Sequence, residues 1–224
     1  MSPDLVQAFV RSIELKDAST AAHTWRVVLY ARALAERLGV PPDDLRRITY
    51  AAALHDIGKI DIPGEILRKP GALTDEEFEI VKTHTTLGHE RLVRMGETDP
   101  ILLELVRHHH ERWDGLGYPD GLAGEAIPLG PRLFAVIDTF DALTSIRPYR
   151  QDVGPDAAER ALVEIDASRE TRYWPEAARL FRELYETGGV TWILHYFNDS
   201  VCDPIEAIDR IERIEQAETR RCRR

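Results

Sequence analysis

Cysteine is scarce in this 224-residue sequence, which contains only Cys202 and Cys222, both near the C-terminus. Their spacing matches no zinc-binding motif, and two thiols are too few for the disulfide framework of a small secreted domain. Long apolar runs are also missing, and the N-terminal stretch MSPDLVQAFVRSIELKD contains early acidic residues. The sequence therefore predicts no signal peptide and no membrane span, and we expect the protein in the cytoplasm.

Basic residues are in the minority. Lysine and arginine total 29 against 39 aspartates and glutamates, which gives a formal net charge of -10. Binding along a nucleic-acid backbone requires a concentrated basic face, so this balance argues against a nucleic-acid partner. An anionic ligand would have to be held by metal ions or by a small local group of basic side chains.

Alternating patterns typical of β-strands are absent as well, as are internal repeats and low-complexity linkers. Apolar residues at helical spacing fill most of the chain instead. They predict a helix ending at Gly39, one from Pro42 towards Gly58, one from Thr74 through His84, one from Pro100 through His110 and one from Pro131. Further helical segments follow towards the C-terminus, so the predicted fold class is all-α.

Ionisable residues lie at or near the ends of these inward helical stripes, where apolar side chains are expected. They are His23, His55, His84, His109 and Asp138. A single inward histidine is most simply a hydrogen-bonded core residue. Several together, with Asp56 directly after His55, favour a shared metal centre, because imidazole and carboxylate ligands bind the same divalent ions. A carboxylate can bridge two ions, and two ions about 3.5–4 Å apart suit in-line attack on a phosphodiester.

Four longer motifs carry a resemblance to a known family. They are HDIGKIDIP from His55, KPGALTDEE from Lys69, HHERWDGLGYPDGLAGEAIPL from His109 and VIDTFDALTSIRPYR from Val136. Together they resemble the HD-GYP domain over residues 19–175. HD-GYP proteins are metal-dependent phosphodiesterases that open the bacterial second messenger cyclic di-GMP within an all-helical HD fold. The resemblance implies an HD-GYP domain over residues 1–180. Beyond the match, an apolar stretch and further helical spacing predict a helical extension over 181–224 that packs against the same domain.

The resemblance also implies a ligand set for two metal ions. One ion would be held by His23, His55, Asp56 and Asp138, and the other by His84, His109, His110 and the same, bridging Asp56. The family motif begins HHE, so the resemblance makes His109 and His110 the ligands and excludes His108. Helical periodicity alone leaves this choice open. Ser19 stands where some family members carry a glutamate for a third ion, so we expect two ions. The donors favour iron or manganese and leave zinc, nickel and cobalt open.

Basic residues in the same motifs are implied to contact the substrate. Lys59, Arg147 and Arg150 match positions that hold the substrate phosphates in the family. Such local positive charge is needed in an acidic protein that stabilises the developing negative charge of a phosphoryl group. Together with the metal-bridging Asp56, Lys59 is the residue we expect to act in catalysis.

The glycine-rich loop after His110 is implied to border the substrate. Its substrate-binding residues would be Gly117, Tyr118 and Pro119. In the family this loop has been linked to contacts with GGDEF diguanylate cyclases, the enzymes that make cyclic di-GMP. Carboxylates near the ligand histidines would either orient those rings or form structural salt bridges; they are Glu111, Asp114 and Asp141.

The function that follows is hydrolysis of cyclic di-GMP to linear pGpG, and the sequence leaves open whether a second cut continues to GMP. Two alternatives stay open. A catalytically silent module would sense a cyclic dinucleotide or dock a cyclase, and a hydrolase of a related substrate such as cyclic GMP-AMP would use the same phosphate contacts. An HD-type hydrolase of nucleoside phosphates would not require the glycine-rich loop or the RPYR motif. The sequence is compatible with a monomer or a homodimer.

Overall fold

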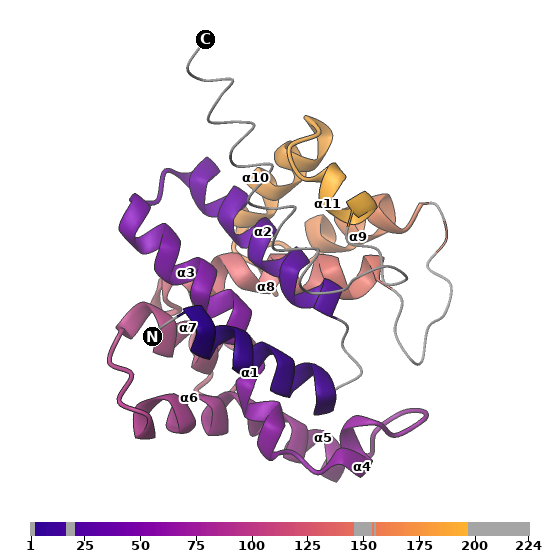
Figure 1. The fold of residues 1–224 in the computed structure, drawn as a ribbon. Helices are drawn as coiled ribbons and strands as arrows, with labels where there is room; N and C mark the ends of the chain where they lie inside the picture. Colours follow the sequence, from indigo (N-terminus) through magenta and orange to yellow (C-terminus); the bar gives the residue numbers. More distant parts are fainter. Residues whose placement is uncertain (1–2, 17–20, 146–153, 155, 197–224) are drawn as a thin grey trace.

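The computed structural model describes residues 3–16, 21–145, 154 and 156–196 (Figure 1). Over these residues the chain forms helices and connecting loops, with isolated β-bridges between Asp114 and Ala123 and between Arg169 and Tyr173, and no β-strand. The all-α prediction is confirmed. Among the residues singled out from the sequence, Ser19, Arg147, Arg150 and the segment 197–224 lie outside the described part.

α2 and α8 pack against each other near the middle of the described structure (Figure 1). In chain order the described helices are α1 (Pro3–Lys16), α2 (Ala21–Leu38), α3 (Pro42–Leu54), the 3₁₀ helix η1 (Ile57–Asp61), α4 (Gly64–Leu67), α5 (Asp75–Lys82), α6 (His84–Arg94), α7 (Pro100–His108), the 3₁₀ helix η2 (Gly124–Ala126), α8 (Leu129–Thr144), α9 (Ala157–Ala167), α10 (Pro175–Glu186) and α11 (Thr191–Tyr196). α2 packs against α3 and α8, and α7 packs against α3 and α6. α9 and α10 pack against α8, and η1 packs against α6.

Aromatic side chains of α2, α8 and α10 meet in the core. Tyr30 lies edge-on to both Phe140 and Phe181, with ring centroids 5.6 Å apart in each pair, and all three rings are buried. Each such burial stabilises the fold by about 1.5–3 kcal/mol. The proposed boundary between residues 1–180 and 181–224 falls inside α10, where Leu180 and Phe181 both belong to this core. The division of the chain at that point stays a prediction.

Two helices that carry candidate ligands end earlier than their apolar periodicity predicts. α3 ends at Leu54 instead of continuing towards Gly58, and α7 ends at His108. His55 and His109 are therefore C-cap residues. In both places the imidazole folds back and donates to a carbonyl of the last helical turn, a contact typical of helix C-termini.

The predicted third helix is in fact two helices, α5 and α6. Thr74 begins α5 with the predicted capping box. Thr83 interrupts the run, because its backbone N–H and its hydroxyl both donate to the Ile80 carbonyl, at 3.1 and 2.6 Å. Phe78 and His84, which one continuous helix would place on a single inward face, therefore lie on different helices, with Phe78 half-exposed and His84 buried.

Candidate metal centre

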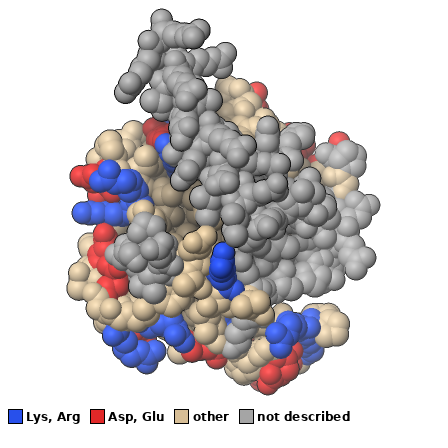
Figure 2. All heavy atoms as spheres, in the orientation of Figure 1, with Lys and Arg blue, Asp and Glu red and all other residues tan. Residues whose placement is uncertain are grey.

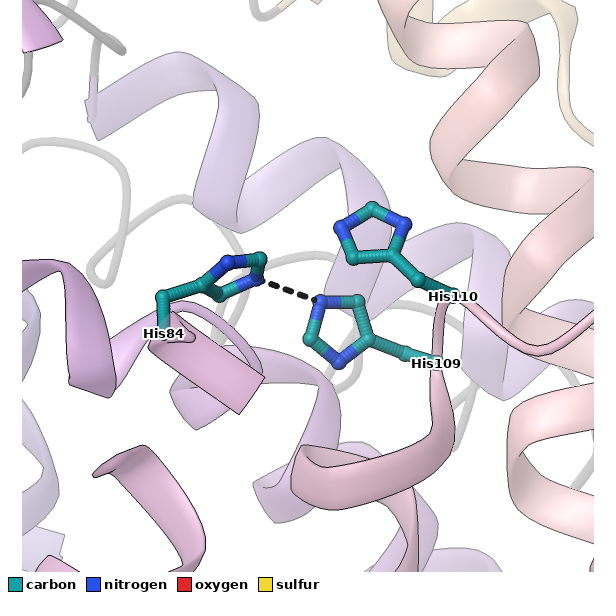
Figure 3. Close-up of side chains that lie close together, drawn as sticks. All are labelled: His84, His109 and His110. Carbon is teal, nitrogen blue, oxygen red and sulfur yellow. Dashed lines mark hydrogen bonds between the residues drawn. The ribbon is translucent and has the colours of Figure 1, made fainter. Parts of the chain in front are cut away.

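Imidazole rings from α6 and from the end of α7 converge (Figure 3). His84 begins α6, His109 is the C-cap of α7, and His110 follows it. Nε2 of His84 lies 3.1 Å from Nε2 of His109, and the ring centroids of His109 and His110 are 4.2 Å apart. One nitrogen from each ring belongs to a group in which all atoms lie within 4.8 Å of one another. We call these three residues the first ligand group.

A second ligand group comprises His23, His55 and Asp56, whose ligand atoms also lie within 4.8 Å of one another. Oδ2 of Asp56 lies 3.1 Å from Nε2 of His55. Oδ1 of the same carboxylate lies 3.5 Å from Nε2 of His84, in the first ligand group. Asp56 thus turns one oxygen toward each group, a placement that supports the predicted bridging role.

The other nitrogen of these rings is bound within the protein. In His55, His84 and His109, Nδ1 donates to the carbonyl oxygen of the residue three positions earlier; the acceptors are Ala52 at 2.8 Å, Val81 at 2.7 Å and Val106 at 3.0 Å. A carbonyl oxygen only accepts, so Nδ1 carries a proton, and in the neutral ring Nε2 then keeps the lone pair. The backbone therefore holds these rings in the tautomer and orientation that a metal ion requires.

His23 differs because its Nδ1 donates to a side chain, Oδ2 of Asp141, at 2.7 Å. Asp141 is fully buried, and the buried Arg26 guanidinium donates to both of its oxygens, at 2.5 and 3.2 Å. Arg26 also donates to the hydroxyl of Ser145 at 2.7 Å. Asp141 therefore orients the ring of His23, which is one of the two roles that the sequence suggested for it.

Burial sets the charge of the candidate ligands. It lowers the pKa of all three histidines of the first ligand group, and that of His110 to about 3, so these rings are neutral at neutral pH. Burial alone would raise the pKa of Asp56, but the charges of His55 and Lys59 hold it well below its usual value. Neutral imidazoles beside an ionised carboxylate are the donors that divalent transition metals prefer, so the residues fit metal ions.

A cavity of about 510 Å³ opens beside the first ligand group. His109, His110 and Asp138 line it, although Asp138 joins neither ligand group within the 4.8 Å limit. Further lining residues come from α5, the glycine-rich loop and the segment before α10: Phe78, Lys82, Gly117, Tyr118, Arg172 and Tyr173. Beside the second ligand group, the ammonium of Lys59 donates to Oδ2 of Asp56 at 2.8 Å. The cavity has the size of a small-ligand site.

Two carboxylates near the histidines stabilise the conformation of the glycine-rich loop through hydrogen bonds. Glu111 accepts from the backbone N–H groups of Asp120 and Leu122, at 2.8 and 3.1 Å. Asp114 forms a two-bond pair with Arg112, at 3.0 and 2.5 Å. Of the two roles that the sequence left open, Asp114 therefore has the structural salt bridge, and the described partners of both carboxylates lie within the loop.

The loop approaches the centre closely. A Cβ atom on Gly117 would lie 2.4 Å from the backbone nitrogen of Arg112, so only glycine permits this path. The Tyr118 ring packs on the His110 ring, with centroids 4.9 Å apart. Gly117 and Tyr118 line the cavity, whereas Pro119 is not among its described lining residues.

The segment that leads into α10 also borders the site, and no sequence motif indicated it. Arg172 and Tyr173 line the cavity. The Arg172 carbonyl accepts from the backbone N–H of Trp113 at 3.2 Å, and the Tyr173 hydroxyl donates to Thr139, next to Asp138, at 3.1 Å. This segment belongs to none of the motifs, so its position beside the site emerges only from the folded chain.

The family described as "HD domain" matches residues 7–176, a stretch that contains both ligand groups and the glycine-rich loop. The chain belongs to the HD-domain family. The motif resemblance is thereby confirmed for the HD domain, and the known proteins it matches agree with the HD-GYP assignment.

Known proteins similar to this HD domain include cyclic dinucleotide phosphodiesterases. It is 45% identical over 174 residues to the "Cyclic di-GMP phosphodiesterase" of Thermotoga maritima, covering 76% of this chain and 46% of the relative. It is 36% identical over 186 residues to the "3'3'-cGAMP-specific phosphodiesterase 2" of Vibrio cholerae, covering 83% and 35%. The structure of Bd1817, an HDG"Y"P protein from Bdellovibrio bacteriovorus, has the same fold, with a TM-score of 0.59 at 19% identity over 73% of this chain and 51% of that one. The chain spans less than half the length of both curated relatives.

The fold gathers most of the site residues predicted for this HD domain. Those in the ligand groups are His23, His55, Asp56, His84, His109 and His110. Asp138 lies at the cavity and Lys59 at Asp56, whereas Arg147 and Arg150 are outside the described residues. His108 stays outside both groups and pairs with Asp120 at 2.9 Å. The assigned roles stay predictions.

The surface of this HD domain carries mixed charge. On the face drawn in Figure 2, basic and acidic side chains of the described residues lie beside one another rather than in one basic area. The lack of one basic area among the described residues of this face agrees with the net charge of -10. Within the described ranges, each helix is too short or too polar to cross a membrane.

Gly58 in η1 lies where only glycine fits against α6. A Cβ atom there would lie 1.8 Å from the carbonyl oxygen of His84 and 2.6 Å from the backbone nitrogen of Gly88. We expect Gly58→Ala to displace His84 and to lower the free energy of unfolding by about 3 kcal/mol, the upper end of overpacking costs. Urea denaturation and metal quantification measure both effects. The matched control is Gly64→Ala, whose added carbon would meet the end of the flexible Arg68 side chain; equal stability of the two variants would contradict the prediction.

Proposed function

We propose that this HD domain is a metal-dependent phosphodiesterase that hydrolyses cyclic di-GMP to pGpG and pGpG further to GMP. The observation that carries the proposal is the Asp56 carboxylate, which faces two groups of buried imidazoles beside a cavity of about 510 Å³. The name of the Thermotoga maritima relative supports the substrate.

Divalent ions held by the two groups would supply Lewis acidity and lower the pKa of the attacking water. The residues of the chain provide the remaining parts of the mechanism. Asp56, ionised in its buried position, would be a ligand of both ions. Lys59 lies 2.8 Å from Asp56 and would donate to a phosphate oxygen as negative charge develops there. We assign further phosphate contacts to Arg147 and Arg150.

Two ions, iron or manganese, are the proposed cofactors, and zinc, nickel and cobalt suit the same donors. The proposed number follows from the two ligand groups, each of which supplies three ligand atoms. Docking of a GGDEF cyclase on the glycine-rich loop is a further proposal, supported by Leu116 in that loop, which is 76% exposed. The cytoplasmic location and the choice between monomer and homodimer stay predictions.

A second candidate substrate is 3′3′-cGAMP. It is favoured by the names of Vibrio cholerae relatives that are 35–38% identical to this chain. Both candidates have the same ring of two phosphodiesters and differ in one base, so the metal centre serves either.

The test is anaerobic incubation of the protein, loaded separately with iron(II) or manganese(II), with cyclic di-GMP and with 3′3′-cGAMP. Products are separated chromatographically, and metal is quantified per chain. We expect about two ions per chain, with pGpG and then GMP from cyclic di-GMP and no product after chelation. Re-addition of metal should restore turnover, which controls for damage by the chelator. Tight binding of the dinucleotide with two ions but no product would instead identify a sensor module.

A further inference from the structure

Lys82, the last residue of α5, places its ammonium near two aromatic rings on the cavity wall. Nζ lies 5.2 Å from the centroid of the Phe78 ring and 5.6 Å from that of the Tyr118 ring. All three residues line the cavity that also contains His110 and Asp138. We call Phe78, Lys82 and Tyr118 the aromatic–lysine wall. None of its members belongs to either ligand group.

Phe78 is 46% exposed, although it is a large apolar residue. It lies one turn before Lys82. Because α5 ends before Thr83, the Phe78 ring is not buried in the core as His84 is. An exposed aromatic ring in a ligand cavity suits stacking with a planar base, since every nucleobase has an apolar face. Ile80, between Phe78 and Lys82 on the same helix, is also exposed but does not line the cavity.

The wall has a fixed relation to the metal centre. Tyr118 packs on His110 with their rings inclined by only 32°, and His110 belongs to the first ligand group. A single small ligand could therefore place a base on the wall and a phosphate at the metal centre. A dinucleotide has this arrangement, in which a planar base is attached through a sugar to a phosphodiester.

The ammonium of Lys82 retains hydrogen-bonding capacity. It pairs with Glu79 at 2.5 Å, but the Glu79 side chain is 67% exposed, so water competes for this pair. An ammonium carries three donors, and one carboxylate oxygen takes one of them. The remaining donors suit a ligand edge that presents acceptors.

We propose that the aromatic–lysine wall binds a base of the dinucleotide and selects guanine over adenine. The base stacks on Phe78, and Lys82 donates to O6 and N7. Guanine presents two acceptors on this edge, whereas adenine presents the N7 acceptor beside an amino donor, which an ammonium cannot bind. The inference rests on the proposed function and assigns a site for one guanine, a base that both candidate substrates carry.

The experiment compares kcat/KM for cyclic di-GMP and for cyclic di-AMP, which has the same ring but no guanine, measured on the metal-loaded protein. We expect Lys82→Met to lower the preference for cyclic di-GMP about tenfold, the usual effect of one base-edge contact, mainly through KM. Lys82→Arg should retain the preference, because a guanidinium donates to the same two acceptors. Phe78→Ala should raise KM for both substrates about tenfold, since stacking does not distinguish the purines.

The matched control is Ile80→Ala, which removes an exposed apolar side chain of α5 outside the cavity and should change neither KM nor ion content. An unchanged substrate preference in Lys82→Met would overturn the proposal, as would an equal loss for both substrates accompanied by lost metal. Absence of turnover in the wild type refutes the proposed function instead. The wall is then tested by calorimetry with GMP and AMP, where a GMP preference that Lys82→Met abolishes supports it and equal binding of the two overturns it.

Discussion

Asp56→Ala is expected to remove most of both bound ions and to lower kcat/KM for cyclic di-GMP by more than about 10³-fold. The physical reason is that the two oxygens of this one carboxylate face Nε2 of His55 and Nε2 of His84, which belong to different ligand groups. Loss of a single transition-state contact already costs about 10²–10³-fold, and this substitution would remove a ligand from each ion. Metal per chain and steady-state kinetics, measured on the same preparation, provide the test.

Asp61→Ala is the matched control for that substitution. Asp61 is the last residue of η1, the 3₁₀ helix that Asp56 precedes as N-cap, and its carboxylate pairs with Arg91 at 2.6 Å and belongs to neither ligand group. A pair of this exposed kind contributes about 0–1 kcal/mol, so this variant should keep its ions and its turnover. Full metal content in Asp56→Ala would refute the bridging role. Loss of a single ion would assign Asp56 to one metal only.

Asp141→Ala is expected to lower the free energy of unfolding by about 3–5 kcal/mol. It would leave the guanidinium of Arg26, which is 2% exposed, without the carboxylate that accepts from it. It would also release the ring of His23, so metal affinity should fall by about 10–100-fold, as it does when partners of ligand histidines are removed elsewhere. Urea denaturation of the metal-free protein separates the stability effect from the metal effect.

The same carboxylate predicts a pH dependence of stability. Burial would raise the pKa of Asp141, but Arg26 and His23 hold it well below the ordinary value of 3.8. The folded protein therefore binds fewer protons than the unfolded chain, so this contribution is fully present above about pH 4 and is lost as the pH falls below that. Denaturation of the wild type at pH 3–5 should show this loss, and Asp141→Asn should flatten the curve. Parallel curves for the two proteins would contradict the assignment.

A double variant separates stability from positioning. Arg26→Met combined with Asp141→Leu replaces the buried ion pair with apolar side chains, and such replacements are often neutral or stabilising. We expect it to recover most of the stability lost in Asp141→Ala while metal affinity stays low, because the ring of His23 still lacks its acceptor. Recovery of both properties would show that Asp141 acts only through stability.

Much of the metal centre was predictable because it depends on local patterns. The apolar stripes ended at histidines, and these stripes placed the rings of His55, His84 and His109 on the inside, where they are found buried. The capping box at Thr74 and the helix end at Gly39 were also predicted correctly. Each of these features is determined by residues within two or three turns of the chain.

The remaining features depend on contacts between distant residues. No periodicity reveals that Glu111 binds backbone groups nine and eleven residues later, or that residues 171 and 172 hold the glycine-rich loop through backbone hydrogen bonds. The interruption at Thr83 was missed because threonine differs little from its neighbours in helix propensity. That interruption exposes Phe78 and so creates the aromatic–lysine wall.

The early helix ends have an electrostatic consequence. α3 ends one residue before His55, α5 two residues before His84 and α7 one residue before His109. Each of these three imidazoles donates to a carbonyl in the last turn of the helix that precedes it. The C-terminus of a helix carries a partial negative charge of about half an elementary charge. The last carbonyls of these helices therefore place partial negative charge at the ligand imidazoles without adding formal charge. Ions held by these neutral donors would keep more of their positive charge than ions surrounded by carboxylates, and an anionic substrate would be attracted by that charge.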